Sequence, residues 1–158
     1  MRYWLMKSEP DAFSIDDLKN SPGKKTHWDG VRNYQARNYM RDGMKKGDQI
    51  FFYHSNCEVP GIVGIAEVAS RSAYPDHTAF DPEDHHFDPK SNPENPSWLM
   101  VDIRYKRKTR RTISLTELKQ HDDRLQGFAL IRRGNRLSVM PVEKPHWDFI
   151  LGLEEQDA

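Results

Sequence analysis

Short segments of strand-like sequence, separated by turn residues, constrain the fold of this chain more than any other feature. Alternation of apolar and polar residues at a period of two is typical of β-strands with one buried face. Such segments, together with apolar runs of strand length, lie at residues 2–7, 49–54, 62–69, 98–106, 111–113 and 137–142. They form no strand–helix–strand repeats. The pattern therefore predicts an α+β fold built on a small, mostly antiparallel β-barrel of five or six strands.

Short helices are predicted around this barrel from their capping residues. Serine and asparagine side chains at a helix start can accept the free backbone N–H groups of the first turn. Proline is favoured in the first turn for a related reason, because it lacks an N–H group. The predicted helices cover residues 14–19, 33–42 and 114–120, which begin at the capping residues Ser14, Asn33 and Ser114. A final helix is predicted from Pro145.

Length and composition limit the class of protein. At 158 residues, the chain is expected to form a single domain over residues 1–158. The 24 basic and 24 acidic side chains balance, which argues against a protein that coats nucleic acid through bulk charge. Its one cysteine, Cys57, excludes a disulfide framework. No apolar run reaches the roughly 20 residues of a membrane helix, and no signal-peptide pattern is present, so a soluble intracellular protein without a membrane partner is expected.

Charge is unevenly distributed along the chain. Residues 76–94 carry six acids and one base, within a segment (75–97) that contains five prolines and little periodicity. Residues 104–111 carry six bases and no acid, and are interpreted as a solvated strand edge. The acidic segment contains residues that can bind divalent ions, but their spacing matches no fixed zinc motif, so no metal site is expected. These residues are Asp76, His77, Asp84, His85, His86 and Asp88.

Trp28 lies between His27 and Asp29, outside any periodic segment. A tryptophan that no strand or helix needs for its core is a candidate surface on which a nucleobase can stack. The alternative is that the ring closes one end of the barrel. Lys7-Ser8 and His54-Ser55 each end a predicted strand, and barrel strand ends converge on one rim, where these side chains could contact a base edge. Ordinary turn chemistry is the alternative for both pairs.

Two further patterns have both a functional interpretation and a purely structural one. Arg37, Arg41 and Lys45 recur at four-residue spacing and could form a basic stripe that meets phosphates, or a solvated helix face. His54 beside Ser55 suggests a hydrolytic dyad. Adjacent strand residues point to opposite faces, however, so this pair is not expected to form a nucleophile–base contact.

Five stretches of the sequence resemble the EVE-domain family. They are WLMKSEPD (4–11), WDGVRNYQARN (28–38), GDQIFFYHS (47–55), PGIVGIAEV (60–68) and RLSVMPV (136–142). The resemblance extends from about residue 2 to residue 151. This family belongs to the PUA-like superfamily and is related to YTH domains, which hold methylated adenine in an aromatic cage. The resemblance implies a PUA-like barrel with a pocket for a modified nucleobase, in the cytoplasm of a bacterium or the nucleus of a eukaryote.

The resemblance also implies roles for individual residues. Trp28 would stack on the inserted base, with Ser8 and Asp29 near its polar edge. The full set expected at the base pocket is Lys7, Ser8, Glu9, Trp28, Asp29, Asn33, Tyr34, His54 and Ser55. The set expected to contact the nucleic-acid backbone is Gln35, Arg37, Arg41, Lys45, Asn135 and Arg136. The second cage tryptophan of YTH domains has no counterpart, and Phe87 and Tyr74 are the candidates to replace it.

The sequence therefore predicts a non-enzymatic module that accommodates a flipped, modified base of DNA or RNA, without a cofactor, a metal or a catalytic residue. Flipping costs a few kcal/mol, which stacking and hydrogen bonds in the pocket would offset. A monomer is expected. Two alternatives stay open at this point: a metal-dependent or hydrolytic enzyme acting on nucleotides, and a small-molecule-binding module that uses the same pocket.

Overall fold

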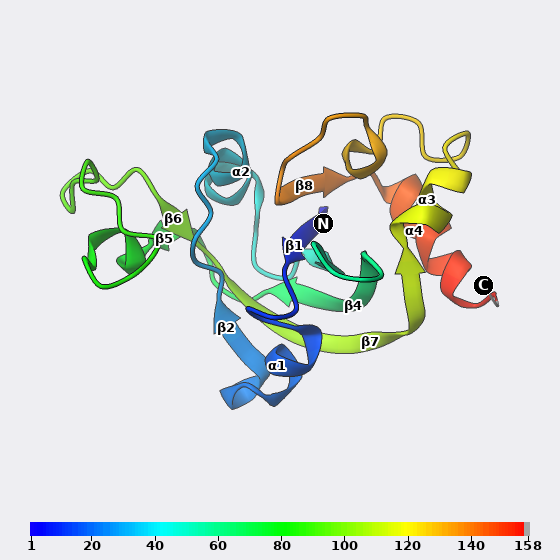
Figure 1. Ribbon diagram of the computed structural model, residues 1–158, viewed down its shortest axis with the longest axis horizontal. Helices are drawn as coiled ribbons and strands as arrows, with labels where there is room; N and C mark the ends of the chain where they lie inside the picture. The colour runs from blue at the N-terminus through cyan, green and yellow to red at the C-terminus, as the bar shows by residue number, and fades with distance from the viewer. Residues whose placement is uncertain (157–158) are drawn as a thin grey trace.

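The computed structural model describes residues 1–156 and contains a curled six-stranded sheet in the order β2-β7-β4-β3-β1-β8 (Figure 1). β1 and β3 are parallel, and the other neighbouring strands are antiparallel. The strands are β1 Tyr3–Ser8, β2 Lys25–His27, β3 Gln49–His54, β4 Gly61–Val68, β7 Asp102–Ser114 and β8 Val139–Val142, while β5 Tyr74–Pro75 and β6 Leu99–Met100 form a separate pair. This arrangement confirms the predicted α+β fold.

Short helices surround the sheet (Figure 1). The α-helices are α1 Ile15–Asn20, α2 Tyr34–Asn38, α3 Leu115–Gln120 and α4 Lys144–Glu154. Three 3₁₀-helical turns are η1 Pro22–Lys24, η3 His77–Phe80 and η4 Ala129–Ile131, and η2 Tyr39–Gly43 is a π-helical turn. Among residues 1–156, no helix combines the length and the apolar character needed to cross a lipid bilayer.

Apolar side chains are buried on both faces of the sheet, because the strands alternate between two cores. Trp4 and Met6 of β1 pack with residues of α1 and α2 in one cluster. Leu5, between them, packs with residues of α3 and α4 in the other cluster. The same alternation places Phe52 in the first cluster and Phe51 in the second. β2 and β8 remain as the two edges of an open half-barrel.

The predicted helix starts at the capping residues are confirmed. Ser14 Oγ accepts the Asp17 N–H group at 3.0 Å, and the Asp17 carboxylate accepts the Ser14 N–H group at 2.8 Å, which completes a capping box at α1. Asn33 and Ser114 cap α2 and α3 by accepting a backbone N–H group from the first turn. Pro145 lies in the first turn of α4.

Three predicted element boundaries are wrong. Residues 98–106 and 111–113 do not form two separate full strands, because β7 runs through the basic segment and bends at two register shifts against β4. Residues 25–27, where no strand is predicted, pair with β7 as β2. The helix expected over 33–42 changes at Tyr39 into a π-helical turn. Gly43 ends that turn against the Trp4 ring, where a Cβ atom would lie 2.6 Å from a ring carbon.

The basic residues of β7 are ion-paired, so the interpretation as a simply solvated edge is incomplete. Their acidic partners lie on the neighbouring strand, on α1 and α3, and at the end of α4. The pairs are Arg104 and Lys106 with Glu67, Arg107 with Glu154, Lys108 with Asp16, Arg110 with Glu155, and Arg111 with Glu117. Paired side chains offer little net charge to a phosphate, so this run is a poor candidate for nucleic-acid contact.

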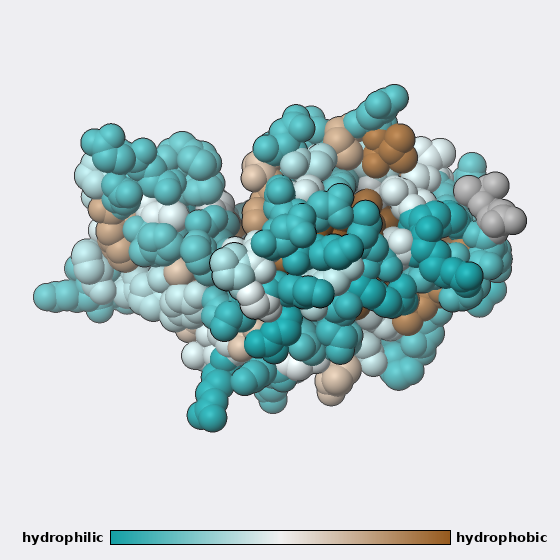
Figure 2. Space-filling view, turned by 90° about the horizontal axis from the view of Figure 1, so that it is seen from below, coloured by the Kyte–Doolittle hydropathy of each residue, from teal (hydrophilic) through white to brown (hydrophobic). Residues whose placement is uncertain are grey.

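The segment between β5 and β6 forms a lobe at one end of the molecule, at the left in Figure 1. The space-filling view shows a largely hydrophilic surface and a hollow between this lobe and the rest of the molecule (Figure 2). Trp98 fixes the base of the lobe, because its indole N–H group donates to Asp88 at 2.7 Å. That hydrogen bond holds the pKa of Asp88 below its usual value.

Candidate functional site

A cleft of about 790 Å³ opens where the ends of β1 and β2 meet the residues that precede β8. Its size is typical of a small-ligand site. The residues that line it are Lys7, Ser8, Glu9, Ala12, Phe13, Thr26, His27, Trp28, Asp29, Gly30, Ser55, His85, His86, Arg136 and Ser138. The structure thus brings together six of the nine residues expected at the base pocket: Lys7, Ser8, Glu9, Trp28, Asp29 and Ser55.

The parallel pairing of β1 with β3 brings their ends to one rim of the sheet. Ser8 is the register partner of His54, and the Ser55 N–H group donates to the Ser8 carbonyl at 3.0 Å. The predicted convergence of the two strand ends is therefore confirmed. Glu9 is tied to the following β3–β4 loop, since its carboxylate accepts a hydrogen bond from Asn56 at 3.1 Å.

Trp28 is both a core residue and a wall of the cleft. Only 9% of its surface is exposed, and its ring meets Phe52 edge-on with a centroid distance of 5.5 Å. Its backbone N–H group donates to the Val101 carbonyl at 2.7 Å. The ring is consequently held in place before any ligand binds, which reduces the entropy lost on stacking.

Polar groups of different character surround this ring. The Ser8 hydroxyl donates to the Phe13 carbonyl at 2.5 Å, which leaves its lone pairs to accept hydrogen bonds. The half-buried Lys7 supplies a donor, and burial lowers the pKa of its ammonium group. Asp29 supplies a carboxylate, 3.4 Å from His27 Nε2. The cleft can therefore offer donors and acceptors to the edge of a planar ring.

His85 and His86 complete the lining from the distant lobe, and sequence reasoning did not find them as cleft residues. Their rings lie 3.8 Å apart between centroids. His86 packs directly over Gly30, where a Cβ atom would lie 2.5 Å from the imidazole. Gly30 also has a φ of +79°, so both its backbone conformation and this contact require glycine. In the sequence, Gly30 is the one sign that another segment packs closely here, but His86, which makes this contact, lies in a segment without periodicity.

Three residues expected at the base pocket lie outside its lining. The Tyr34 ring stacks on Trp98 at a centroid distance of 4.7 Å and is 58% exposed. Asn33 caps α2. His54 Nε2 accepts the Ile15 N–H group at 3.1 Å, so this imidazole supports α1 rather than the cleft. The two cage candidates, Tyr74 and Phe87, also lie outside the lining, with the Tyr74 hydroxyl bonded to Asp102.

The neutral form of His54 is required for its hydrogen bond to Ile15, which gives a testable pH dependence. Burial lowers the pKa of His54 below its ordinary value of 6.5. The unfolded chain then binds the proton more readily, so the free energy of unfolding should fall as the pH drops below about 6.5 towards the folded-state pKa. In His54→Gln, whose amide oxygen can still accept the bond, this part of the decline should disappear.

Urea unfolding at several pH values between 5 and 8 measures this effect. His85→Gln is the matched control, because it makes the same substitution at an exposed histidine. Equal profiles for the wild type and His54→Gln would contradict the assignment.

A second, smaller notch of about 290 Å³ adjoins the cleft through Arg136, which lines both. Its lining is Asn33, Gln35, Tyr39, Arg132, Arg133, Gly134, Asn135, Arg136 and Leu137. It contains no acidic residue, and no ion pair involving its three arginines occurs within residues 1–156. Unlike the arginines of β7, these cations remain available to an anion. Gln35, Asn135 and Arg136 of the expected backbone set meet in this arginine notch.

The predicted basic stripe does not form a continuous array. The π-helical turn at Tyr39–Gly43 interrupts the four-residue spacing on which the stripe depends. The Arg37 guanidinium donates to the Ser97 carbonyl at 2.9 Å, and Arg41 pairs with Asp42 at 2.8 Å. Lys45 lies beyond the turn and is exposed. The expectation of one aligned stripe is therefore corrected.

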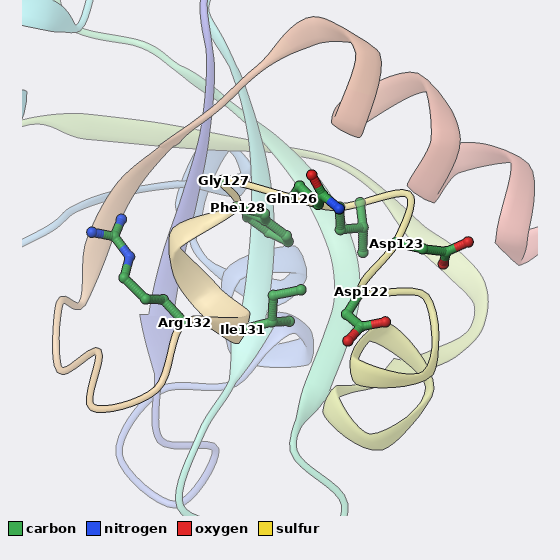
Figure 3. A pocket seen from close by; sticks show the side chains of 8 residues that line it. Asp122, Asp123, Gln126, Gly127, Phe128, Ile131 and Arg132 are labelled. Atoms are coloured by element: carbon green, nitrogen blue, oxygen red, sulfur yellow. The ribbon is translucent and has the colours of Figure 1, made fainter.

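Another pocket, of about 630 Å³, lies between α3 and η4 and suits an anion less well (Figure 3). Its lining includes the carboxylates of Asp122 and Asp123 and one arginine, Arg132. Phe128 and Ile131 provide its apolar part. The two acids would repel a phosphate group.

Asp76 connects the cleft to the lobe. It is fully buried and accepts hydrogen bonds from the Gly30 N–H group at 2.8 Å, from Arg32 at 3.0 Å and from the Thr78 hydroxyl at 2.5 Å. Burial alone would raise the pKa of Asp76, but the bonds from Thr78, Gly30 and Arg32 together hold it below the ordinary value. Asp76, one of the metal candidates in the sequence, is thus occupied by structural contacts.

This chain is similar in sequence to a family of known proteins. A family model described as the EVE domain matches residues 2–153. The chain belongs to the EVE-domain family. Thymocyte nuclear protein 1 of Gallus gallus is 48% identical over 170 residues, which covers 98% of this chain and 69% of that protein. The family resemblance found in the sequence motifs is therefore confirmed.

Solved structures of family members have the same fold. Human THYN1 protein in complex with 5-methylcytosine-containing DNA superimposes with a TM-score of 0.95 at 45% identity, over 100% of both chains. A protein from Pseudomonas syringae superimposes with a TM-score of 0.90 at 49% identity, over 96% of this chain and 99% of that one. The predicted PUA-like architecture of an EVE domain is confirmed by these likenesses.

Proposed function

We propose that this protein binds a modified nucleobase, flipped out of DNA or RNA, in the cleft beside Trp28. The observation that carries the proposal is the convergence of a fixed aromatic ring, the Lys7-Ser8 strand end and the Asp29 carboxylate on one cleft. The family member solved with 5-methylcytosine-containing DNA supports it and makes 5-methylcytosine the first ligand to test.

The lining suits a methylated cytosine chemically. Its ring would stack on Trp28, and its exocyclic amino group would donate to an acceptor such as Ser8 or Asp29. Lys7 would donate to the carbonyl or ring nitrogen. Ala12 and Phe13 supply apolar lining against which a methyl group can be buried. A methyl group in a shaped apolar site is worth about 1–3 kcal/mol, which is enough to distinguish modified from unmodified cytosine.

The arginine notch would hold the phosphates that flank the flipped nucleotide. Contacts of this kind position the backbone without reading sequence, and they make the affinity depend on salt. The paired residues of β7 cannot substitute, because acidic side chains already neutralise them. Net charge zero is consistent with weak affinity for nucleic acid that lacks the modified base.

Charge reversal in the notch should weaken binding and reduce its salt dependence. For Arg136→Glu, the slope of log affinity against log salt should fall by about one for each phosphate that the protein no longer neutralises. Arg110→Glu is the matched control, because Arg110 already pairs with Glu155 outside both pockets. Equal slopes for Arg136→Glu and the wild type, measured by fluorescence anisotropy at four salt concentrations, would place the phosphate contacts elsewhere.

Binding in this cleft requires no bond to be made or broken, so we infer a non-enzymatic module. The hydrolytic alternative loses its proposed base, because His54 Nε2 accepts the Ile15 N–H group and is not directed to Ser55. For a eukaryotic source we infer a nuclear location, which agrees with the name of the vertebrate relatives.

Base flipping is tested directly by placing 2-aminopurine opposite a 5-methylcytosine in a short duplex. Its fluorescence increases when the neighbouring stack opens, so adding protein should raise the signal. The matched duplex with unmodified cytosine should show a much smaller rise at equal protein occupancy. Tight binding with no fluorescence change for the methylated duplex would mean that the base is read inside the helix, contrary to the proposal.

A further inference from the structure

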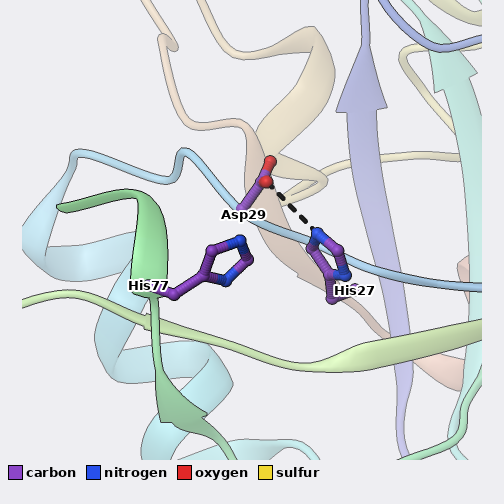
Figure 4. Close-up of side chains that lie close together, drawn as sticks. All are labelled: His27, Asp29 and His77. Atoms are coloured by element: carbon purple, nitrogen blue, oxygen red, sulfur yellow. Dashed lines mark ion pairs between the residues drawn. The ribbon is translucent and has the colours of Figure 1, made fainter. Parts of the chain in front are cut away.

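We propose that His27, Asp29 and His77 form a binding site for one divalent transition-metal ion, such as Zn²⁺, at the rim of the cleft. The three side chains converge from the end of β2, the loop that follows it and η3 (Figure 4). One potential ligand atom from each residue lies within 4.8 Å of the other two. This site differs from the sequence expectation that the protein has no metal site.

The spacing of the donor atoms is close to that of a metal site. Bonds of roughly 2.0–2.2 Å from a tetrahedral zinc ion place neighbouring ligand atoms roughly 3.3–3.6 Å apart. His27 Nε2 and Asp29 Oδ2 are already 3.4 Å apart. The His27 and His77 rings meet edge-to-face with centroids 5.1 Å apart. His77 is exposed, so a small rotation of its side chain can move its ligand nitrogen closer to the other two ligand atoms, by on the order of 1 Å, without disturbing the core.

A buried carboxylate fixes the two segments that carry these ligands. Asp76 accepts the N–H group of Gly30, the residue after Asp29, at 2.8 Å. It also caps η3 by accepting the Thr78 N–H group at 2.9 Å, which sets the position of His77. His27 is held independently by the pairing of β2 with β7. A site on rigid backbone needs little ordering when the ion binds.

The donor set indicates the class of ion. Two imidazoles and one carboxylate suit borderline ions such as Zn²⁺ better than Mg²⁺ or Ca²⁺, which prefer oxygen ligands. Three protein ligands leave a fourth position open. His27 and Asp29 line the cleft, so a ligand in the cleft could reach that position.

A second group, Asp84, His85 and His86, is a weaker candidate. Its members are consecutive residues of one turn, and Asp84 Oδ1 already accepts the His86 N–H group at 2.8 Å. His86 is also fixed by its contact with Gly30. This group therefore serves as the matched control.

Isothermal titration with Zn²⁺ alone tests the proposal, with Co²⁺ absorption spectroscopy reporting the ligand set. The wild type should bind one equivalent. His77→Ala should weaken binding by at least about tenfold, a lower bound because removing even a group that only supports a ligand has an effect of this size. His85→Ala should leave the affinity unchanged. His77 is exposed and lies outside the cleft lining, so folding and oligonucleotide binding without metal should persist in His77→Ala.

The alternative outcomes are equally distinct. Absence of Zn²⁺ binding in the wild type, or equal affinity in the wild type and His77→Ala, would overturn the site. Loss of binding in His85→Ala would assign the ion to the other histidine pair and would overturn it as well. A second variant, His27→Gln, should reproduce the loss seen for His77→Ala, because it removes a different ligand of the same ion.

Discussion

Trp28→Leu is expected to reduce the affinity for a modified oligonucleotide by roughly five- to 150-fold. This range corresponds to the loss of about 1–3 kcal/mol of stacking between a base and an aromatic ring. Leucine retains apolar volume in the core but has no π face. The measurement is the dissociation constant by fluorescence anisotropy with 5-methylcytosine DNA as the first ligand.

Because Trp28 is also a core residue, stability has to be separated from recognition. A Trp→Ala change in a core costs about 3–5 kcal/mol, and Trp→Leu should cost less. Trp147→Leu is the matched control, since Trp147 of α4 is similarly buried, with 4% of its surface exposed, but belongs to the second core cluster and lies outside the cleft lining. Both variants should lose stability, and only Trp28→Leu should lose affinity. Equal affinity in the two folded variants would remove Trp28 from the proposed site.

The largest expected effect on stability is that of Asp76→Ala, about 3–5 kcal/mol. The substitution leaves the Arg32 guanidinium without its carboxylate and the Gly30 N–H group without its acceptor. The buried pair and its hydrogen bonds join the cleft turn to the lobe, so His85 and His86 should also lose their fixed position beside the cleft. Urea unfolding measures the stability, and hydrogen exchange of residues 77–88 reports the loosening.

The pH dependence of this contribution follows from the lowered pKa of Asp76. A carboxyl group whose pKa is lowered by folding stabilises the protein fully at any pH above its pKa in the unfolded chain, which is 3.8 for Asp76. This contribution is lost as the pH falls through the lower pKa of the folded state. Asp81→Ala is a suitable control, because Asp81 is exposed on the same segment. If Asp76→Ala lowered the free energy of unfolding no more than Asp81→Ala does, Asp76 would not join the cleft turn to the lobe as described.

Local signals predicted much of the fold. The strand predicted at residues 2–7 is β1, and because neighbouring strand residues point to opposite faces, Trp4 and Leu5 lie in different cores. The capping residues Ser14, Asn33 and Ser114 predicted where their helices begin. Features that depend on distant packing were missed. The π-helical turn ends where Gly43 meets the Trp4 ring, an approach that no local periodicity reveals.

The cleft was predictable only where its residues lie at strand ends or in a distinctive motif. Lys7, Ser8 and Trp28 satisfy that condition, and the structure places them together. His85 and His86 come from a segment without periodicity and reach the cleft through Gly30 and Arg32. The arginine notch and the group of His27, Asp29 and His77 likewise join residues far apart in sequence. Sequence spacing alone cannot place such residues within contact distance of one another.

The proposed cleft favours a modified base through its own contacts, independently of the charge that binds the backbone. The most direct test compares the affinity of the wild type for two duplexes that differ only in one 5-methylcytosine, at two salt concentrations. The proposal predicts that the methylated duplex binds at least about fivefold more tightly, as expected for 1–3 kcal/mol, and that this ratio persists when salt weakens both affinities. Equal affinities for the two duplexes, falling together with salt, would mean that only the backbone is bound and would contradict recognition of 5-methylcytosine in this cleft.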